Sequence, residues 1–239
     1  MTINDNVRAQ HRLATERFGV KTIKLATGFS MGAIQAFHWA ALYPDMVERV
    51  APICGAARCS RHNYVFLAGL KAGLVADQNF NGGEYLAKPV AGLKAFGRIY
   101  AGWAFSQAFY REQVDIMTMG FASADDFLEG FWDPLFQDRD PNNLLAMLRT
   151  WQQADIAADG RYRGDFDLAL KSVSAKAVIM PSTTDLYFPV ADSEHEAATM
   201  PNAVCTPIPT IWGHVAGNAG ANPPDTTFVN ERIAELLAS

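Results

Sequence analysis

The sequence predicts an α/β fold in which a mainly parallel sheet is flanked by helices and carries an inserted helical lid. Near both ends of the chain, short apolar runs alternate with segments whose apolar residues recur at helical spacing. Strands that alternate with helices form parallel sheets with right-handed crossovers. The middle of the chain shows helical patterns rich in aromatic residues and no strand pattern. With 239 residues, 49% of them hydrophobic, the chain can bury the core of one globular domain.

The N-terminal segment is expected to contain a helix, a strand, a second helix and a second strand. Asn4 or Asp5 is a suitable N-cap for the first helix, and Gly19 is expected to end it. Buried strands are predicted at residues 23–27 and 47–53, where short apolar runs occur. Small and apolar residues between these strands recur at helical spacing and predict the second helix.

The C-terminal segment returns to alternating strands and helices. Strands are predicted from Lys176 to Pro181 and from Ala203 to Ile208, with a helix from Asp192 to Met200 between them. A closing helix is predicted from Thr226 to Leu237. These elements extend the parallel sheet that the N-terminal strands begin.

The long helical middle of the chain is interpreted as a lid inserted between strands of one core. We expect residues 1–54 and 168–239 to form that core and residues 55–167 to form the lid. No internal repeat or low-complexity segment interrupts this organisation.

The composition excludes several classes of function. The formal net charge is -5 at pH 7, and no basic stripe is present that could neutralise nucleic-acid phosphates. Cys54, Cys59 and Cys205 are an odd number without C-x-x-C spacing, which indicates neither a disulfide framework nor a metal site. The N-terminus has no signal-peptide pattern, and no apolar run approaches the length of about 18 residues that a membrane span needs. We expect a cytoplasmic protein that binds a small molecule, without nucleic acid or membrane as partner; a homodimer is left open.

The most informative motif is the G-x-S-x-G run from Gly28 to Gly32, which lies between the predicted strand at 23–27 and a helix. A tight turn from a strand into a helix exposes the serine hydroxyl, and small residues on both sides of the serine relieve the crowding. This context predicts that Ser30 is a nucleophile and that the backbone N–H of Met31 is one donor of an oxyanion hole. The sequence shows no second donor.

Two further residues complete the expected site. In this kind of fold the chain order is serine, then aspartate or glutamate, then histidine. Asp185 follows the strand at 176–181 and His214 follows the strand at 203–208, so both are expected in loops beyond the carboxyl ends of parallel strands. Taken singly, Asp185 is also compatible with a turn residue and His214 with a loop histidine bonded to backbone. Their order and placement favour a triad in which His214 is the general base and Asp185 orients its ring.

Several spaced segments resemble the homoserine O-acetyltransferase family of α/β-hydrolase-fold proteins. The matching segments are Asp5 to Gln10 with Phe18 to Val20, Gly28 to Gly32, Asp77 with Asn81 to Tyr85, Pro89 with Gly92-Leu93, Asp185 to Pro189, and Gly213-His214. The resemblance covers nearly the full length of the chain and implies an α/β-hydrolase-like fold. It also implies ping-pong acetyl transfer, in which the serine takes acetyl from acetyl-CoA and passes it to an alcohol such as the homoserine hydroxyl. Acetyl-CoA is then a co-substrate, and no bound cofactor is expected.

The resemblance also bears on substrate binding and on the N-terminus. Arg98 lies in the lid where the family has an arginine that would grip a substrate carboxylate, and Val215 stands where family members carry an aspartate that holds the substrate amine. The family has N-terminal strands before the first helix, including the loop that offers the second oxyanion N–H. Our hypothesis is that the sequence is a truncated form without these strands, so that the strand at 23–27 has no sheet neighbour on one side.

Three functions follow from these residues. The first is an O-acetyltransferase that moves acetyl from acetyl-CoA to an alcohol through an acyl-serine. The second is a carboxylesterase of the same fold, in which water takes the place of the alcohol; the balance depends on how well the lid excludes water and positions the acceptor. The third is a non-catalytic remnant that binds a partner through its open sheet edge.

Overall fold

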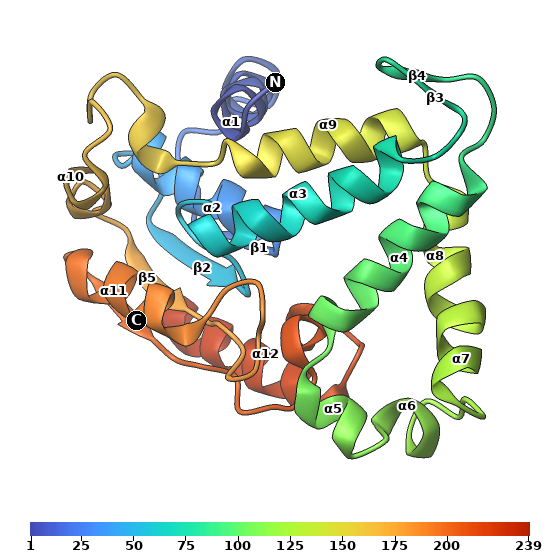
Figure 1. Cartoon of the computed structure of the whole chain (residues 1–239). Helices are drawn as coiled ribbons and strands as arrows, with labels where there is room; N and C mark the ends of the chain where they lie inside the picture. The colour runs from blue at the N-terminus through green and yellow to red at the C-terminus, as the bar shows by residue number, and fades with distance from the viewer.

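A four-stranded parallel sheet lies between layers of helices in the computed structural model, which describes residues 1–239 (Figure 1). Its strands are β1 (Ala26–Phe29), β2 (Arg49–Ile53), β5 (Lys176–Ile179) and β6 (Ala203–Cys205), in the spatial order β1-β2-β5-β6. Every neighbouring pair of strands is parallel. The predicted α/β fold with a mainly parallel sheet is confirmed.

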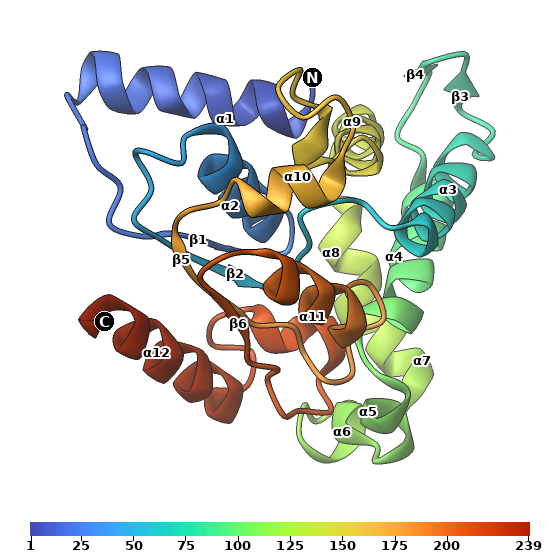
Figure 2. The same ribbon diagram turned by 90° about the vertical axis from the view of Figure 1, so that its left-hand side faces the viewer.

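Helices cover both faces of this sheet. They are α1 (Ile3–Arg12), α2 (Met31–Leu42), α10 (Phe166–Lys171), α11 (Val190–Thr199) and α12 (Pro223–Ala238). Successive side chains of a strand point to opposite faces, and in β2 Val50 joins a core cluster with α2 and α10, whereas Ala51 joins a cluster with α12. Figure 2 accordingly shows α2 and α12 on opposite sides of the sheet, with α1 outside α2. No helix has the length and apolar character that crossing a bilayer requires.

The segment between β2 and β5 is mainly helical, as predicted. Besides α10 it contains α3 (Arg61–Val75), α4 (Val90–Ala104), α5 (Gln107–Arg111), α6 (Val114–Met117), α7 (Ala124–Phe127), α8 (Asp133–Gln137) and α9 (Pro141–Gln152). A short antiparallel hairpin of β3 (Phe80–Asn81) and β4 (Glu84–Tyr85) was not predicted. The aromatic core of this segment is continuous with Ile3 of α1 and Ile34 of α2. The division into a core of 1–54 and 168–239 and a lid of 55–167 stays a prediction.

Two boundaries near the N-terminus differ from the prediction. The first helix is capped by Thr2 and not by Asn4 or Asp5, because Thr2 Oγ1 accepts from the Asp5 N–H (3.2 Å) while the Asp5 carboxylate accepts from the Thr2 N–H (2.8 Å). The first strand begins at Ala26, since Ile23 forms only an isolated bridge. Gly19 has a φ of +64° and lies just beyond the end of the helical segment, as expected.

Candidate active site

The turn between β1 and α2 holds Ser30 in a strained backbone conformation. Ser30 has φ 57° and ψ -120°, and such conformations cost a residue with a Cβ about 1–3 kcal/mol. The Ser30 N–H donates to the carbonyl oxygen of Ile53 at the end of β2 (3.0 Å), which ties the turn to the neighbouring strand. A Cβ on Gly28 would lie 2.5 Å from the carbonyl carbon of Gly32, whereas a Cβ on Gly32 would meet nothing within 4 Å. The crowding is therefore relieved at Gly28 and not, as also expected, at Gly32.

Asp185 and His214 lie in loops that follow β5 and β6. Asp185 Oδ1 accepts hydrogen bonds from the backbone N–H groups of Tyr187 (2.7 Å) and Phe188 (3.2 Å), which fixes the carboxylate within its loop. His214 lies in a short 3-10 helix that begins at Gly213. The φ of Gly213 is +60°, and an added Cβ there would lie 2.7 Å from a backbone oxygen at the end of α4. The loop can therefore approach α4 closely only with glycine at this position.

The structure brings Ser30, His214 and Asp185 into one hydrogen-bonded row. His214 Nδ1 lies 2.9 Å from Asp185 Oδ2, and His214 Nε2 lies 2.9 Å from Ser30 Oγ. The carboxylate accepts a hydrogen bond from Nδ1–H, which leaves the lone pair of Nε2 free to accept from the serine hydroxyl. This is the arrangement in which a serine can lose its proton to the ring as it attacks. The three side chains that the sequence singled out thus meet at one edge of the sheet.

The acid and the base are shielded from water by aromatic side chains. The side chain of His214 is 8% exposed and that of Asp185 is 0% exposed. The ring of Tyr187 stands perpendicular to the imidazole at 4.6 Å, and the ring of Phe29 lies at 4.7 Å from it. Burial raises the pKa of the Tyr187 phenol well above its usual value, so this neighbour keeps its proton. The low polarity of these surroundings strengthens the hydrogen bonds of the row.

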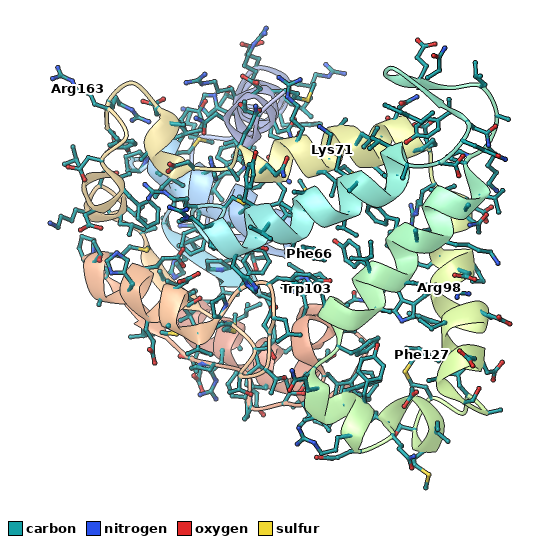
Figure 3. The ribbon with its side chains drawn as sticks, viewed as in Figure 1. Phe66, Lys71, Arg98, Trp103, Phe127 and Arg163 are labelled. Atoms are coloured by element: carbon teal, nitrogen blue, oxygen red, sulfur yellow. The ribbon has the colours of Figure 1, made fainter.

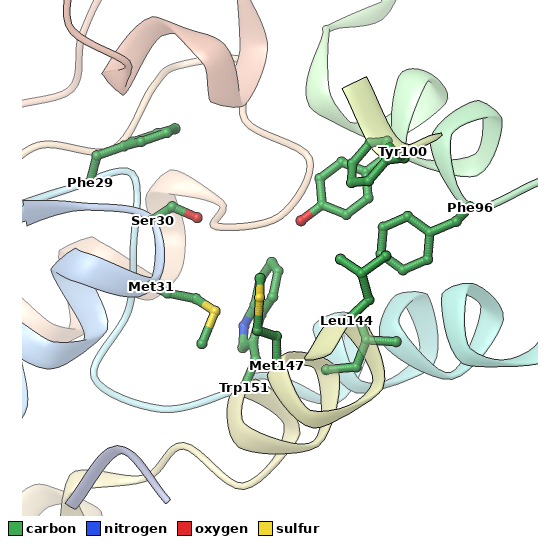
Figure 4. A pocket seen from close by; sticks show the side chains of 10 residues that line it. Phe29, Ser30, Met31, Phe96, Tyr100, Leu144, Met147 and Trp151 are labelled. Carbon is green, nitrogen blue, oxygen red and sulfur yellow. The ribbon is translucent and has the colours of Figure 1, made fainter. Parts of the chain in front are cut away.

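Ser30 opens onto an apolar pocket of about 280 Å³ (Figure 4). Every lining side chain other than that of Ser30 is hydrophobic. The lining comes from the serine turn and from α4, α8 and α9: Phe29, Ser30, Met31, Phe96, Tyr100, Phe136, Leu144, Met147, Leu148 and Trp151. Figure 4 shows the hydroxyl of Ser30 and that of Tyr100 on opposite sides of the space. The pocket offers no charged side chain to a bound molecule.

Met31 is the first residue of α2, directly after Ser30. The N–H groups of the first helical turn have no acceptor within their own helix. The Met31 N–H is thus in the position that an oxyanion donor next to the nucleophile requires. Its role as a donor stays a prediction.

Arg98 does not line the pocket. Figure 3 labels Arg98 on α4. Its guanidinium lies 3.1 Å from the carboxylate of Asp133, which Lys94 also approaches at 3.2 Å. The pocket residues of α4 are Phe96 and Tyr100, each two positions from Arg98, and residues two apart on a helix do not share a face. The expected grip of Arg98 on a substrate carboxylate is therefore not supported by its placement.

Metal-ligating side chains approach one another at the triad itself. Cys54, Asp185 and His214 each offer one ligand atom, all within 4.8 Å of one another. The carboxylate and the imidazole of this group are already joined by the hydrogen bond of 2.9 Å. The geometry suits a proton-transfer pair better than an ion site, and no other group of three such side chains lies as close.

Known proteins with similar sequences include esterases and acetyltransferases. Ethyl acetate hydrolase of Pseudomonas veronii is 36% identical over 239 residues, which cover 99% of this chain and 67% of that protein. A probable esterase of Corynebacterium glutamicum is 38% identical over the same shares of both chains. The chain belongs to the α/β-hydrolase family of serine esterases and homoserine O-acetyltransferases. No family model matches the chain.

More distant members of this family and solved structures agree with that assignment. Homoserine O-acetyltransferase of Trichormus variabilis is 29% identical over 223 residues, 90% of this chain and 60% of that protein. The crystal structure of the acetyl esterase MekB superposes with a TM-score of 0.96 at 36% identity, covering 100% of this chain and 69% of the other. An acetylester hydrolase from Corynebacterium glutamicum gives a TM-score of 0.95 at 34% identity, covering 100% and 68%. The chain thus spans about two thirds of the length of these relatives, and it is a serine-nucleophile enzyme by family.

Proposed function

We propose that the protein is a carboxylic-ester hydrolase that cleaves acetyl esters of small, uncharged alcohols through an acyl-serine on Ser30. The observation that carries the proposal is the apolar pocket of about 280 Å³ at the serine. A compact neutral ester loses little on leaving water for such a pocket, whereas a charged group would lose its hydration without gaining a partner. The relatives named ethyl acetate hydrolase and probable esterase, at 36% and 38% identity, support the same class of reaction.

In the acylation half of the reaction, Ser30 Oγ forms a bond to the ester carbonyl carbon while His214 Nε2 takes the hydroxyl proton over 2.9 Å. Asp185 accepts the hydrogen bond from Nδ1–H throughout and stabilises the imidazolium. The carbonyl oxygen becomes an oxyanion, to which the Met31 N–H donates. The bond to the alcohol oxygen then breaks, the imidazolium protonates the departing alkoxide, and an acetyl-serine remains.

In the second half, water hydrolyses the acetyl-serine with the same groups. His214 Nε2 takes one proton from water as the water oxygen bonds to the acyl carbon. The tetrahedral intermediate collapses by breaking its bond to Ser30 Oγ, which recovers the proton from the imidazolium. One ester and one water give one alcohol and one acetic acid, and the enzyme returns to its starting state.

Acetyl transfer to an alcohol is the second candidate, and it is favoured by relatives named homoserine O-acetyltransferase at 27% to 30% identity. Homoserine carries an ammonium and a carboxylate group. The pocket offers neither of them a partner, because Arg98 is paired with Asp133 and Val215 is apolar. For this reason we favour ester hydrolysis over acetyl transfer. Acetyl-CoA would be a co-substrate only if the protein is an acetyltransferase.

The proposal is tested with purified protein that receives ethyl acetate in one reaction and acetyl-CoA, with or without homoserine, in another. We expect release of acetic acid from ethyl acetate, and loss of this release in Ser30→Ala. Ser174→Ala is the matched control, because Ser174 is exposed and its hydroxyl bonds only to the carbonyl oxygen of Pro44. Consumption of acetyl-CoA only in the presence of homoserine, without ester hydrolysis, would replace the proposal by the second candidate. A folded protein that does not react with a fluorophosphonate at Ser30 would favour the non-catalytic remnant.

A further inference from the structure

A buried thiol adjoins the acid and the base of the site. Cys54 directly follows β2, and its backbone N–H donates to the carbonyl oxygen of Met180 just beyond the end of β5 (2.9 Å). The φ of Cys54 is +46°, a conformation that a residue with a Cβ adopts rarely and keeps only where its surroundings hold it. The residue has no exposed surface. Its unusual backbone and complete burial fix the sulfur at one place.

The sulfur fills the space beside the Asp185–His214 pair. Cys54 Sγ, a carboxylate oxygen of Asp185 and a ring nitrogen of His214 all lie within 4.8 Å of one another. An added Cβ at Gly217 would lie 3.0 Å from the sulfur, so the loop that carries His214 packs directly on the thiol. The Asp185 carboxylate near the sulfur is a hydrogen-bond acceptor for the thiol proton.

The carboxylate of Asp185 has room for one more donor. An ionised carboxylate offers about four acceptor sites. The N–H groups of Tyr187 and Phe188 fill two sites on Oδ1, and Nδ1 of His214 fills one on Oδ2. Burial, together with the charge of Asp185, raises the pKa of the Cys54 thiol well above its usual value. The thiol thus keeps its proton, and its sulfur lies within 4.8 Å of a carboxylate oxygen that has an acceptor site to spare.

We propose that Cys54 is a positioning residue whose S–H group donates to Asp185 and holds the carboxylate in the orientation that accepts from His214 Nδ1. The inference rests on the proposed function, because it gives the thiol a part in the proton transfer of ester hydrolysis. The S–H donor also withdraws negative charge from the carboxylate. With the donor present, the carboxylate therefore stabilises the imidazolium less strongly. Removal of the donor should therefore stabilise the imidazolium and move the acidic limb of the pH profile of hydrolysis to higher pH.

The other groups that face the pair do not titrate in the same range. Tyr187 faces the imidazole from the loop after β5, and burial raises the pKa of its phenol well above the usual value. Ser30 faces Nε2 from the start of α2, and the rings of Phe29 and Phe188 complete the enclosure. If the acidic limb of the pH profile shifts when Cys54 is replaced, the shift is therefore caused by the loss of the thiol.

The pH profile of kcat/KM for ester hydrolysis tests the proposal. In Cys54→Ala the acidic limb should move to higher pH by about 0.5 unit, the size expected for loss of one weak hydrogen bond. In Cys54→Ser the hydroxyl keeps a donor, so the limb should stay at the wild-type position or move to lower pH. A role in packing alone lowers the stability of both variants and leaves the limb in place. Cys205→Ala, at the partly exposed cysteine of β6, is the control and should show no shift.

A limb at the wild-type position in Cys54→Ala, or an equal upward shift in Cys54→Ser, overturns the proposal. The infrared S–H stretching band gives a second reading that needs neither activity nor a change at Cys54. In the double variant Cys59→Ala and Cys205→Ala only the Cys54 band remains, and it should lie at the low frequency of a hydrogen-bonded thiol. A band at the position of a free thiol refutes the inference even in an active enzyme. Absence of ester hydrolysis, in contrast, refutes the proposed function while the band still reports the hydrogen bond.

Discussion

The two glycines of the G-x-S-x-G motif allow a direct test of whether the turn controls the nucleophile. An added Cβ at Gly28 would lie 2.5 Å from the carbonyl carbon and 2.6 Å from the carbonyl oxygen of Gly32. These are backbone atoms, so no change of rotamer relieves the contact. An added Cβ at Gly32 would meet no heavy atom within 4 Å. Gly28→Ala and Gly32→Ala therefore add the same methyl group to one turn with opposite steric consequences.

The distances around the two glycines indicate how large the effects on stability and on catalytic rate should be. In Gly28→Ala the contact has to lengthen from 2.5 Å to at least the 3.4 Å of ordinary van der Waals contact, and overpacking of this kind costs about 1–3 kcal/mol of stability. A displacement of about 1 Å of the serine relative to its base lowers a catalytic rate by about 100-fold. Gly32→Ala replaces a glycine in the first turn of α2 and should raise the free energy of unfolding by about 0.5–1 kcal/mol.

Two measurements separate these outcomes. Urea denaturation gives the free energy of unfolding, and the rate of labelling by a fluorophosphonate gives the reactivity of Ser30 without knowledge of the substrate. We expect Gly28→Ala to label about 100-fold more slowly than the wild type and Gly32→Ala to label at the wild-type rate. Equal labelling rates for Gly28→Ala and the wild type, or equal losses in both variants, would refute the link between the turn and the nucleophile.

Four further substitutions test the triad, a buried carboxyl group and the pocket. His214→Ala should abolish labelling of Ser30, because the base is lost. Asp185→Asn should slow labelling by about 10⁴-fold, because an amide favours the wrong imidazole tautomer. Mass spectrometry of the labelled protein measures both rates, and fast labelling of either variant would contradict the triad. Burial raises the pKa of Glu196 from 4.5 to about 8, so the wild type should lose about 5 kcal/mol of stability as the pH rises through this interval. Glu196→Gln should remove this loss, and urea denaturation at both ends of the interval shows whether the two proteins differ. Met147→Ala should widen the pocket and raise the ratio of butyrate-ester to acetate-ester hydrolysis about tenfold, because the two extra methylene groups contribute about 1.6 kcal/mol when buried. An unchanged ratio would show that Met147 does not limit the length of the acyl chain.

The triad could be predicted from the sequence because its signals are local. Ser30 lies in a motif whose glycine at position 28 has a steric cause in the fold. Asp185 and His214 each follow a short apolar strand, and the carboxyl ends of parallel strands meet at one edge of a sheet. Knowledge of the strand order was not needed, since any parallel arrangement of these strands places their C-terminal loops on the same edge.

The pocket could not be predicted in the same way, because its walls depend on how distant helices pack. Phe96, Tyr100 and Trp151 come from α4 and α9, and their common orientation follows from the register of the two helices against the serine turn. The placement of Arg98 outside the pocket has this origin, since a shift of one residue along a helix turns a side chain by about 100°. Cys54 was correctly interpreted as a buried thiol, but its contact with Asp185 depends on a left-handed backbone that no sequence pattern marks.

The choice between water and an alcohol as acceptor of the acetyl group is made by the pocket and not by the triad. The row of Ser30, His214 and Asp185 can deprotonate either acceptor, because both present a hydroxyl to Nε2. An alcohol competes with water, which is present at far higher concentration, only if the pocket binds and orients it. A charged acceptor such as homoserine needs ionic partners for this, and the pocket residues around Ser30 are hydrophobic. An acetyl-serine in this pocket therefore meets water as its default acceptor, which is the physical reason to expect a hydrolase here.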